Sequence, residues 1–259
     1  MDKEHIKKLA ENPDFIPGVY NYCDRWCERC PLTSRCMNFD LSEAEFDNPQ
    51  SRDINNKAFW QKLTEVFQTT LEMLKETAKE QDIDLDSLDV RQASEEHEKT
   101  REIAENHQCC RAAKAYSQIV KDWFDSANEL FEEKADELSG QIQLGLPGSD
   151  PASEAAGLKD SVEIIRWYQH FIYVKLVRAI TSCLEDVPGD SVTEYDANGS
   201  AKIALIAMDR SIAAWGQMSN HFPQLNDEIL DILVHLDRLR RKTEAEFPNA
   251  RAFIRPGFD

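Results

Sequence analysis

Leu225-Asn-Asp-Glu-Ile-Leu-Asp-Ile-Leu-Val-His-Leu-Asp-Arg-Leu239 is the segment from which the fold class is most easily inferred. Its apolar residues recur at intervals of 4, 3, 4 and 3, at Leu225, Ile229, Ile232, Leu236 and Leu239. This spacing places them on one face of an α-helix. The segment therefore predicts a helix that buries one side against other helices.

The same period recurs upstream of this segment. It predicts helices over residues 55–81, 90–140, 151–185 and 200–220. Asp150 followed by Pro151 is a typical helix start. In the second of these helices we expect a break or a kink near Asn106–Gln108, or else an arm that projects from the bundle. The dipeptides Pro188-Gly189 and Asn198-Gly199 predict a loop before the fourth helix.

No stretch alternates between apolar and polar residues over the length of a β-strand. The sequence therefore predicts an all-α fold, an antiparallel bundle of about five helices with an N-terminal four-cysteine loop. We expect two parts. Residues 1–54 form an N-terminal segment with a metal-binding module at 17–50, and residues 55–259 form the helical bundle with a C-terminal tail.

The N-terminal module contains four of the seven cysteines, Cys23, Cys27, Cys30 and Cys36, at the spacing C-x3-C-x2-C-x5-C. Thiolates are strong ligands for zinc and iron, and a short loop can gather four of them at a small entropic cost. The four cysteines are therefore predicted metal ligands. Disulfides and free thiols are the alternatives, and an expected reducing compartment disfavours the first.

The identity of the metal is open at this point, between a 4Fe-4S iron–sulfur cluster and zinc. Pro31 directly after a cysteine, and four ligands in one loop, are typical of compact iron–sulfur loops. Neighbouring aromatic residues could shield a cluster from water, and three arginines interleave the cysteines and would offset their negative charge. The aromatic residues are Tyr20, Tyr22, Trp26 and Phe39, and the arginines are Arg25, Arg29 and Arg35.

The spacing Cys23-x3-Cys27-x2-Cys30 is similar to that of the cluster loop in radical SAM enzymes. That resemblance implies a β/α barrel and an aromatic residue just before the last cysteine. This chain has no predicted strands and carries Arg29 at that position, so the resemblance is confined to the spacing.

Charged residues on otherwise apolar helices are the candidates for a catalytic site. Glu163, Arg166 and His170 form one helical stripe, and Asp209 follows a long apolar run. If these side chains face inward, they form a charged pocket between helices that suits an anionic ligand or proton transfer. The alternative is a solvated surface or a structural network of ion pairs.

The balance of charge limits the possible partners. With 30 basic and 48 acidic residues the net charge is −18, which disfavours binding to nucleic acids or to anionic membranes. No run of residues is apolar enough for a membrane span, and the opening residues lack a signal core, so we expect a cytoplasmic protein. The basic cluster Arg238–Lys242 and the tail Phe253–Phe258 could contact a protein partner.

Two functions follow as hypotheses. In the first, the chain is a metal-binding helical protein whose four-cysteine centre, iron–sulfur or zinc, anchors the N-terminus while the bundle engages a protein partner. In the second, an iron–sulfur redox protein or enzyme uses the charged pocket between helices. The sequence does not establish whether the chain is an enzyme.

Overall fold

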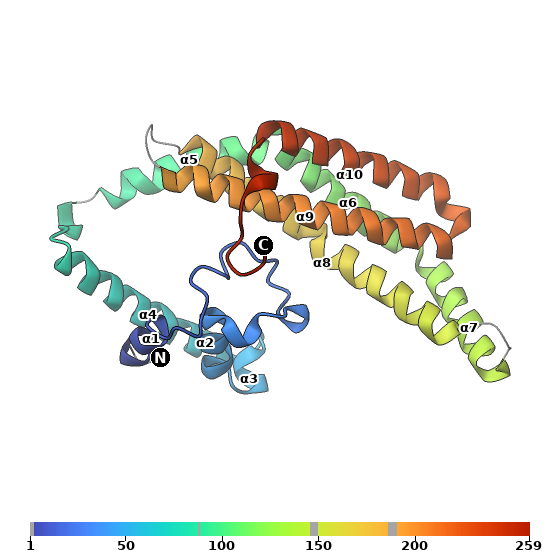
Figure 1. Ribbon diagram of the computed structural model, residues 1–259, viewed down its shortest axis with the longest axis horizontal. Coiled ribbons are helices and arrows are strands. Elements are labelled where there is room, and N and C mark those ends of the chain that lie inside the picture. The colour runs from blue at the N-terminus through green and yellow to red at the C-terminus, as the bar shows by residue number, and fades with distance from the viewer. Residues whose placement is uncertain (1–2, 88, 146–149, 186–190) are drawn as a thin grey trace. The chain divides into compact units, whose positions relative to one another are not determined.

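The computed structural model describes residues 3–87, 89–145, 150–185 and 191–259 (Figure 1). These residues form ten α-helices and short 3₁₀ turns, and no β-strand occurs among them. The fold is therefore all-α, as the sequence predicts. The helices are α1 (Lys3–Ala10), α2 (Met37–Glu45), α3 (Pro49–Arg52), α4 (Lys57–Glu80), α5 (Val90–Asn106), α6 (Gln108–Ser126), α7 (Asn128–Leu144), α8 (Pro151–Leu184), α9 (Ser191–His221) and α10 (Asn226–Glu246).

Residues 90–140 contain three helices where the sequence analysis expects two. The break at His107 confirms the prediction, because its backbone is extended and its Nδ1 accepts a hydrogen bond from the N–H of Cys109 at 3.3 Å. The second break, at Ala127, was not predicted. Ala127 still donates its N–H to the carbonyl of Trp123 at 2.9 Å, so the chain bends there without any residue that signals it.

The predicted loop before α9 is wrong at Asn198-Gly199, which lies inside the helix. Tertiary packing overrides the low helix propensity of these two residues, because Ala197 and Ala201 on either side of them are buried. Asp196, two residues before Asn198, forms an ion pair with Arg178 of α8. Pro188-Gly189 lies outside the described residues.

The contacts within the chain divide it into two compact units. The first, which we call the cysteine unit, comprises Met1–Glu96 and Ile254–Asp259; the second, the helical unit, comprises His97–Phe253. The chain therefore passes between the units twice, inside α5 and again just before its last residues. The domain boundary predicted between residues 54 and 55 stays a prediction.

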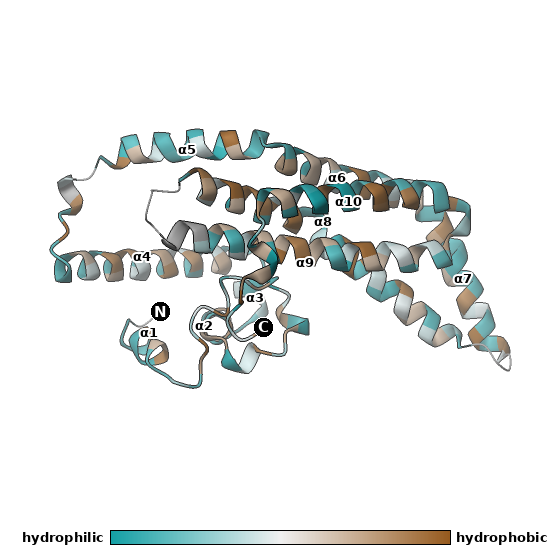
Figure 2. Cartoon of the chain, turned by 45° about the horizontal axis from the view of Figure 1, so that its top comes forward, coloured by the Kyte–Doolittle hydropathy of each residue, from teal (hydrophilic) through white to brown (hydrophobic). Residues whose placement is uncertain are grey.

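In the helical unit, α8 and α9 are the longest helices and lie side by side along most of their length (Figures 1 and 2). Helix α6 packs against α8, and α10 packs against both α9 and α6. Helix α7 packs against α8 and α6. The predicted seam of α10 is buried at Ile229, Ile232, Leu236 and Leu239, which confirms that this face is the packing face.

Aromatic side chains fill the centre of the helical unit. Trp215 is fully buried, and its indole N–H donates to the hydroxyl of Tyr116 at 3.1 Å. Its ring meets that of Trp123 edge to face at 4.8 Å, and Phe131 and Phe222 lie beside them. Such pairs add to the stabilisation that comes from burying the rings.

The cysteine unit buries much less apolar surface. Among its described residues, the buried side chains are those of Val19, Tyr22, Ser51 and Ala78. Helix α1 is joined to α4 by Lys3, whose Nζ lies 2.8 Å from Glu72 and 2.7 Å from Glu76. No helix in the described ranges combines the length and the apolar character that crossing a bilayer requires.

Candidate metal centre

The four cysteines lie on a loop that turns back on itself through two 3₁₀ turns. The first turn spans Cys27–Arg29 and the second spans Thr33–Arg35, so each is followed directly by a cysteine. In both, the N–H of the following cysteine donates to the carbonyl at the start of the turn, at 3.2 Å. Cys36 then serves as the N-cap residue of α2.

The first bend of the loop falls between Cys23 and Cys27. Asp24 accepts a hydrogen bond from the backbone N–H of Trp26 at 3.2 Å, and Arg25 between them has a φ of +59°. A left-handed backbone is costly for a residue with a Cβ, so this conformation is typical of sites where the surrounding structure constrains the chain. Cys23 and Cys27, on either side of this bend, line the same cavity.

All four predicted ligands line one small cavity. Burial, followed by the neighbouring thiols of Cys23, Cys30 and Cys36, raises the pKa of the Cys27 thiol. A cation at this position would relieve the repulsion among thiolates. The remaining residues that line the cavity are largely apolar: Val19, Tyr20, Asp24, Arg25, Trp26, Leu32, Thr33, Phe39 and Phe258.

One backbone donor points at a sulfur. The N–H of Leu32 lies 3.4 Å from the Sγ of Cys30. Hydrogen bonds of this kind stabilise negative charge on a ligating thiolate and tune its metal. The arrangement of Pro31 and Leu32 after Cys30 therefore fits a ligand role for that cysteine.

The predicted shielding and charge-compensating residues divide into two groups. Tyr20, Trp26 and Phe39 line the cavity, whereas Tyr22 is buried beside the loop without lining it. Arg25 lines the cavity as well. Arg29 instead stacks over the ring of Trp26 at 4.0 Å, and Arg35 donates to the backbone carbonyl of Asp14.

Sequence reasoning missed the wall formed by the last residues. Phe258 lines the cavity, and Arg255 holds it in place through an ion pair with Asp259 at 2.9 Å and a stacking contact with the Phe258 ring at 4.9 Å. Gly257, at a φ of +77°, approaches Ile16 so closely that a Cβ there would lie 2.8 Å from its Cδ1. The aromatic and glycine content of the tail was the available signal.

The structure tests the fit of a metal in two respects. Within the part of the chain that is described, no group of three or more His, Cys, Asp or Glu side chains is arranged to hold a metal ion. No disulfide joins any of the seven cysteines, all of which are described. The donor set is nevertheless chemically suited to zinc or iron, because four thiols surround one cavity.

The structure does not gather the four predicted catalytic candidates into one pocket. Arg166 and His170 are exposed on α8, and the Arg166 guanidinium stacks over the Phe124 ring at 4.6 Å. Glu163 is 41% exposed and lies 3.8 Å from Lys159. These three side chains form a solvated helix surface.

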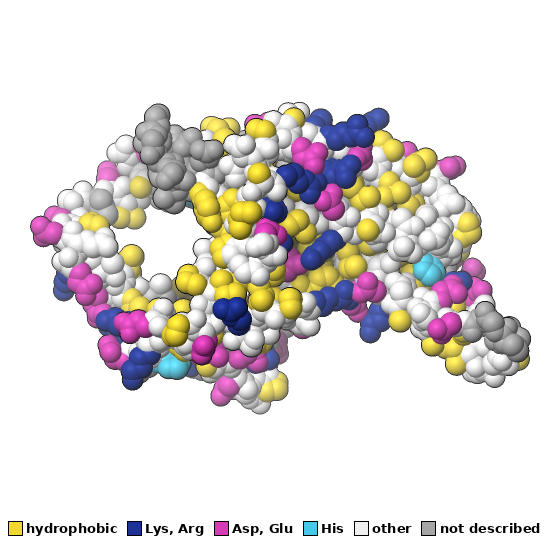
Figure 3. Space-filling view, in the orientation of Figure 1, with side chains coloured by type: hydrophobic (Ala, Val, Ile, Leu, Met, Phe, Trp, Pro, Cys, Tyr) yellow, Lys and Arg dark blue, Asp and Glu magenta, His cyan; other side chains and the backbone are white. Residues whose placement is uncertain are grey.

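Asp209 takes part in a network of ion pairs. Its carboxylate lies 2.6 Å from Arg251 and 3.4 Å from Arg240 of α10, and Arg240 and Arg241 in turn pair with Asp237. Figure 3 shows the alternating basic and acidic side chains over α10. Asp209 therefore joins α9 to α10 and to the turn after it, which is a structural role.

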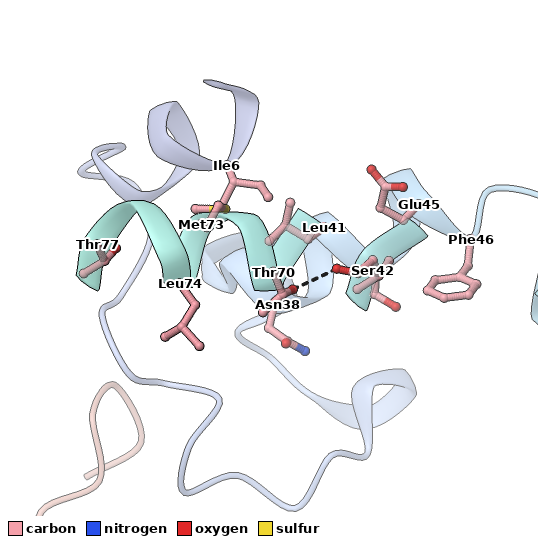
Figure 4. A pocket seen from close by; sticks show the side chains of 11 residues that line it. Ile6, Asn38, Leu41, Ser42, Glu45, Phe46, Thr70, Met73, Leu74 and Thr77 are labelled. Carbon is pink, nitrogen blue, oxygen red and sulfur yellow. Dashed lines mark hydrogen bonds between the residues drawn. The ribbon is translucent and has the colours of Figure 1, made fainter. Parts of the chain in front are cut away.

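Several further cavities, including one in each unit, were not predicted. One, in the helical unit, is lined by charged pairs, among them His97 with Glu185 and Arg178 with Asp196. The other is a groove of about 580 Å³ in the cysteine unit, where Ile6 of α1, Leu41 of α2 and Met73 of α4 face a shared space (Figure 4).

Comparison of the chain with protein families, with curated proteins and with solved structures finds no match in any of the three. The function has to be inferred from the residues of the site itself.

Proposed function

We propose that this chain is a cytoplasmic metal-binding protein. A four-cysteine centre formed by Cys23, Cys27, Cys30 and Cys36 anchors the N-terminal region, and an antiparallel helical bundle engages a protein partner. The observation that carries the proposal is the cavity lined by all four cysteines. Its largely apolar walls and its four thiols are what a metal centre needs.

The small core of the cysteine unit supports a structural role for the metal. Three buried apolar side chains, Val19, Tyr22 and Ala78, are few for a unit of this size. Units with small cores are usually stabilised by metals or disulfides, and no disulfide is present among the described cysteines. Metal binding would supply folding free energy directly, because the unfolded loop has no preformed site.

We favour an iron–sulfur cluster over zinc as the bound group. All four cysteines lie in one loop and line one cavity, as in compact iron–sulfur loops. The apolar walls, the hydrogen bond to the Cys30 sulfur and the adjacent Arg25 are features that tune cluster potential. When bound, the cluster would supply stability and one-electron chemistry.

The residues of this chain have distinct roles in the proposal. The four cysteines bind the metal, and Tyr20, Trp26, Phe39 and Phe258 exclude water. The Leu32 N–H orients and stabilises the Cys30 thiolate. The alternative, a redox enzyme that uses Glu163, Arg166, His170 and Asp209, has less support, because the first three lie on a solvated surface.

The first experiment is metal analysis with an absorption spectrum on protein purified without oxygen. We expect broad visible absorbance, iron and acid-labile sulfide, with about four irons per chain. About one zinc per chain in a colourless sample would show that the bound group is a structural zinc and not a cluster. The absence of both metals would overturn the proposal.

A pair of cysteine variants assigns the metal to the loop. Cys30→Ser should lose the metal, because it removes one of four ligands. Cys183→Ser is the matched control, since Cys183 is an exposed cysteine of α8 in the helical unit. Equal metal content in the two variants would contradict the assignment.

A further inference from the structure

Helix α10 buries one side against α6 and α9 and exposes the other. At about 100° per residue, the exposed side chains that define this outer surface lie within about 60° of its centre line. They are Asp227, Leu230, Asp231, Val234, Arg238 and Arg241. We call these residues the α10 face.

The charges of the α10 face are separated along the helix. Asp227 and Asp231 lie toward its N-terminus, and Arg238 and Arg241 lie toward its C-terminus. Among the described residues, neither acid has an ion-pair partner, nor does Arg238. Arg241 pairs with Asp237 at 2.8 Å, yet its side chain stays 74% exposed. Figure 3 shows basic side chains gathered over the C-terminal half of α10. The face therefore has an acidic half and a basic half of equal charge.

A groove of about 480 Å³ runs along one edge of the α10 face. Its apolar lining comes from Ile212 of α9 and from Leu233 and Val234 of α10, and its charged lining includes Asp237 and Arg241. By helical geometry, Leu233 and Asp237 both lie on the same side of Val234 around the helix. The groove therefore belongs to one edge of the face and not to the other.

Two α10 faces are complementary when they meet antiparallel. We propose that α10 pairs with α10 of a second copy of the chain, about a twofold axis that crosses both helices at Val234. Asp227 and Arg241 lie seven residues before and after Val234, about 10 Å in each direction. The axis therefore places Asp227 of each copy opposite Arg241 of the other, and both ends of the face form ion pairs at once.

The two edges of the α10 face have different contacts in this pairing, because the axis brings each edge against its own counterpart. On one edge, Asp231 faces Arg238 of the second copy, since the two lie three and four residues from the axis. On the other edge, Leu230 is 57% exposed and lies four residues before Val234. It faces the groove of the second copy, which extends as far beyond Val234. Burial of Leu230 supplies hydrophobic free energy that exposed ion pairs do not.

Other occupants match the α10 face less well. A parallel pairing of two copies places acid against acid, and a nucleic acid or an anionic membrane is attracted by the basic half but repelled by the acidic half. The net charge of −18 is spread over the whole chain, and at about 0.15 M salt such fields decay within about 8 Å. The face itself is neutral, so its local pairing decides. The inference rests on the proposed function only for the engagement of a protein by the bundle, and it does not require the metal.

The first measurement is sedimentation equilibrium of the full-length chain, with the metal content of each sample known. We expect the average mass to rise from 29.7 kDa toward twice that value between about 5 μM and about 500 μM protein. The range suits an interface built on one helix, which is small.

A charge exchange tests the register of the pairing. Asp231→Arg should weaken self-association by about tenfold or more, because it places two positive side chains opposite each other on both sides of the axis. Arg238→Asp should do the same with two negative side chains. An equimolar mixture of the two variants should associate again, because each variant then supplies the charge that the other lacks. Restoration in the mixture also shows that both variants are folded.

An apolar variant tests the groove. Leu230→Gln should weaken self-association by about tenfold, because it removes the side chain that enters the groove of the second copy. Phe67→Gln is the matched control, since Phe67 is 65% exposed on α4 in the cysteine unit. It should leave the average mass unchanged at every concentration.

Several outcomes would overturn the proposal. These are a monomer at all concentrations, association that Asp231→Arg leaves unchanged, a mixture of the charge variants that stays monomeric, and an equal loss in Phe67→Gln. The metal content separates this result from the proposed metal centre. A metal-loaded monomer refutes the pairing alone, whereas a metal-free dimer refutes the metal centre and supports the pairing.

Discussion

The helical unit and the cysteine unit are both built from helices, but different forces hold them. In the helical unit every long helix buries apolar side chains against another, and a cluster of aromatic rings lies at the centre. In the cysteine unit α4 alone has 24 residues, yet Ala78 is its one buried side chain. The comparison indicates that hydrophobic burial stabilises the first unit, whereas the second buries few side chains and contains ion pairs such as those of Lys3.

Removal of the metal gives the largest expected difference between the two units. Structural zinc sites contribute about 10–16 kcal/mol in small peptides, so chelation should open the cysteine unit. We expect amide hydrogen exchange of residues 16–46 to increase strongly while α8 and α9 stay protected. Loss of protection in both units at once would show that they unfold as one body and remove the distinction.

Removing a ring from the aromatic core should destabilise the helical unit and leave the cysteine unit unchanged. Trp215→Ala removes a fully buried ring and leaves the Tyr116 hydroxyl without its donor, so the helical unit should lose about 3–5 kcal/mol in urea unfolding. The metal content should not change. Trp60→Ala, at a position that is 53% exposed, is the matched control and should cost less than about 1 kcal/mol. Similar losses in the two variants would contradict the difference in burial.

Two glycine substitutions, one in each unit, should change the free energy of unfolding by smaller amounts and in opposite directions. Gly257→Ala should destabilise the cysteine unit by about 1–2 kcal/mol, because a left-handed φ of +77° disfavours a Cβ. Gly140→Ala in α7 has open space around it and should stabilise its helix by about 0.5–1 kcal/mol. Thermal unfolding measures both variants, and the rate of metal release should change for Gly257→Ala alone. A stabilising Gly257→Ala would show that the tail does not hold its described conformation.

The smallest effect concerns an ion pair between α7 and α8. Lys134 holds the pKa of Glu154 below its usual value, with a further contribution from His221. Because the folded pKa is lowered, the contribution of Glu154 is present above about pH 4.5 and is lost as the pH falls through the lowered value. Glu154→Gln should cost about 0.5–1 kcal/mol at pH 7, measured by urea unfolding. The difference should shrink below pH 4.5; a constant difference would assign the effect to packing.

Local patterns in the sequence predicted the helices well. The apolar spacing of α10 identified its buried face, and Asp150 with Pro151 identified the start of α8, where Asp150 accepts a hydrogen bond from Ser153. Polar residues near Asn106 marked the break before α6. These features depend on residues close together in the chain, so the local sequence is enough to predict them.

Features that depend on distant residues could not be predicted in this way. The residues around Phe258 do not show which part of the chain it contacts, because its contact with the cavity of Cys23 and Cys36 joins opposite ends of the chain. Periodicity identified the apolar residues of α4, such as Phe67, but not whether another helix covers them. The ligand role of the cysteines and the identity of their metal stay predictions.

The position of Phe258 has a consequence for the order of events during synthesis. A ribosome that has made Cys36 must still produce the whole helical unit before it adds Phe258. At about 5–20 residues per second, this takes some tens of seconds. During that interval the four cysteines of the nascent loop are present without Phe258, so the cavity that we propose as the metal site lacks one wall until Phe258 is added.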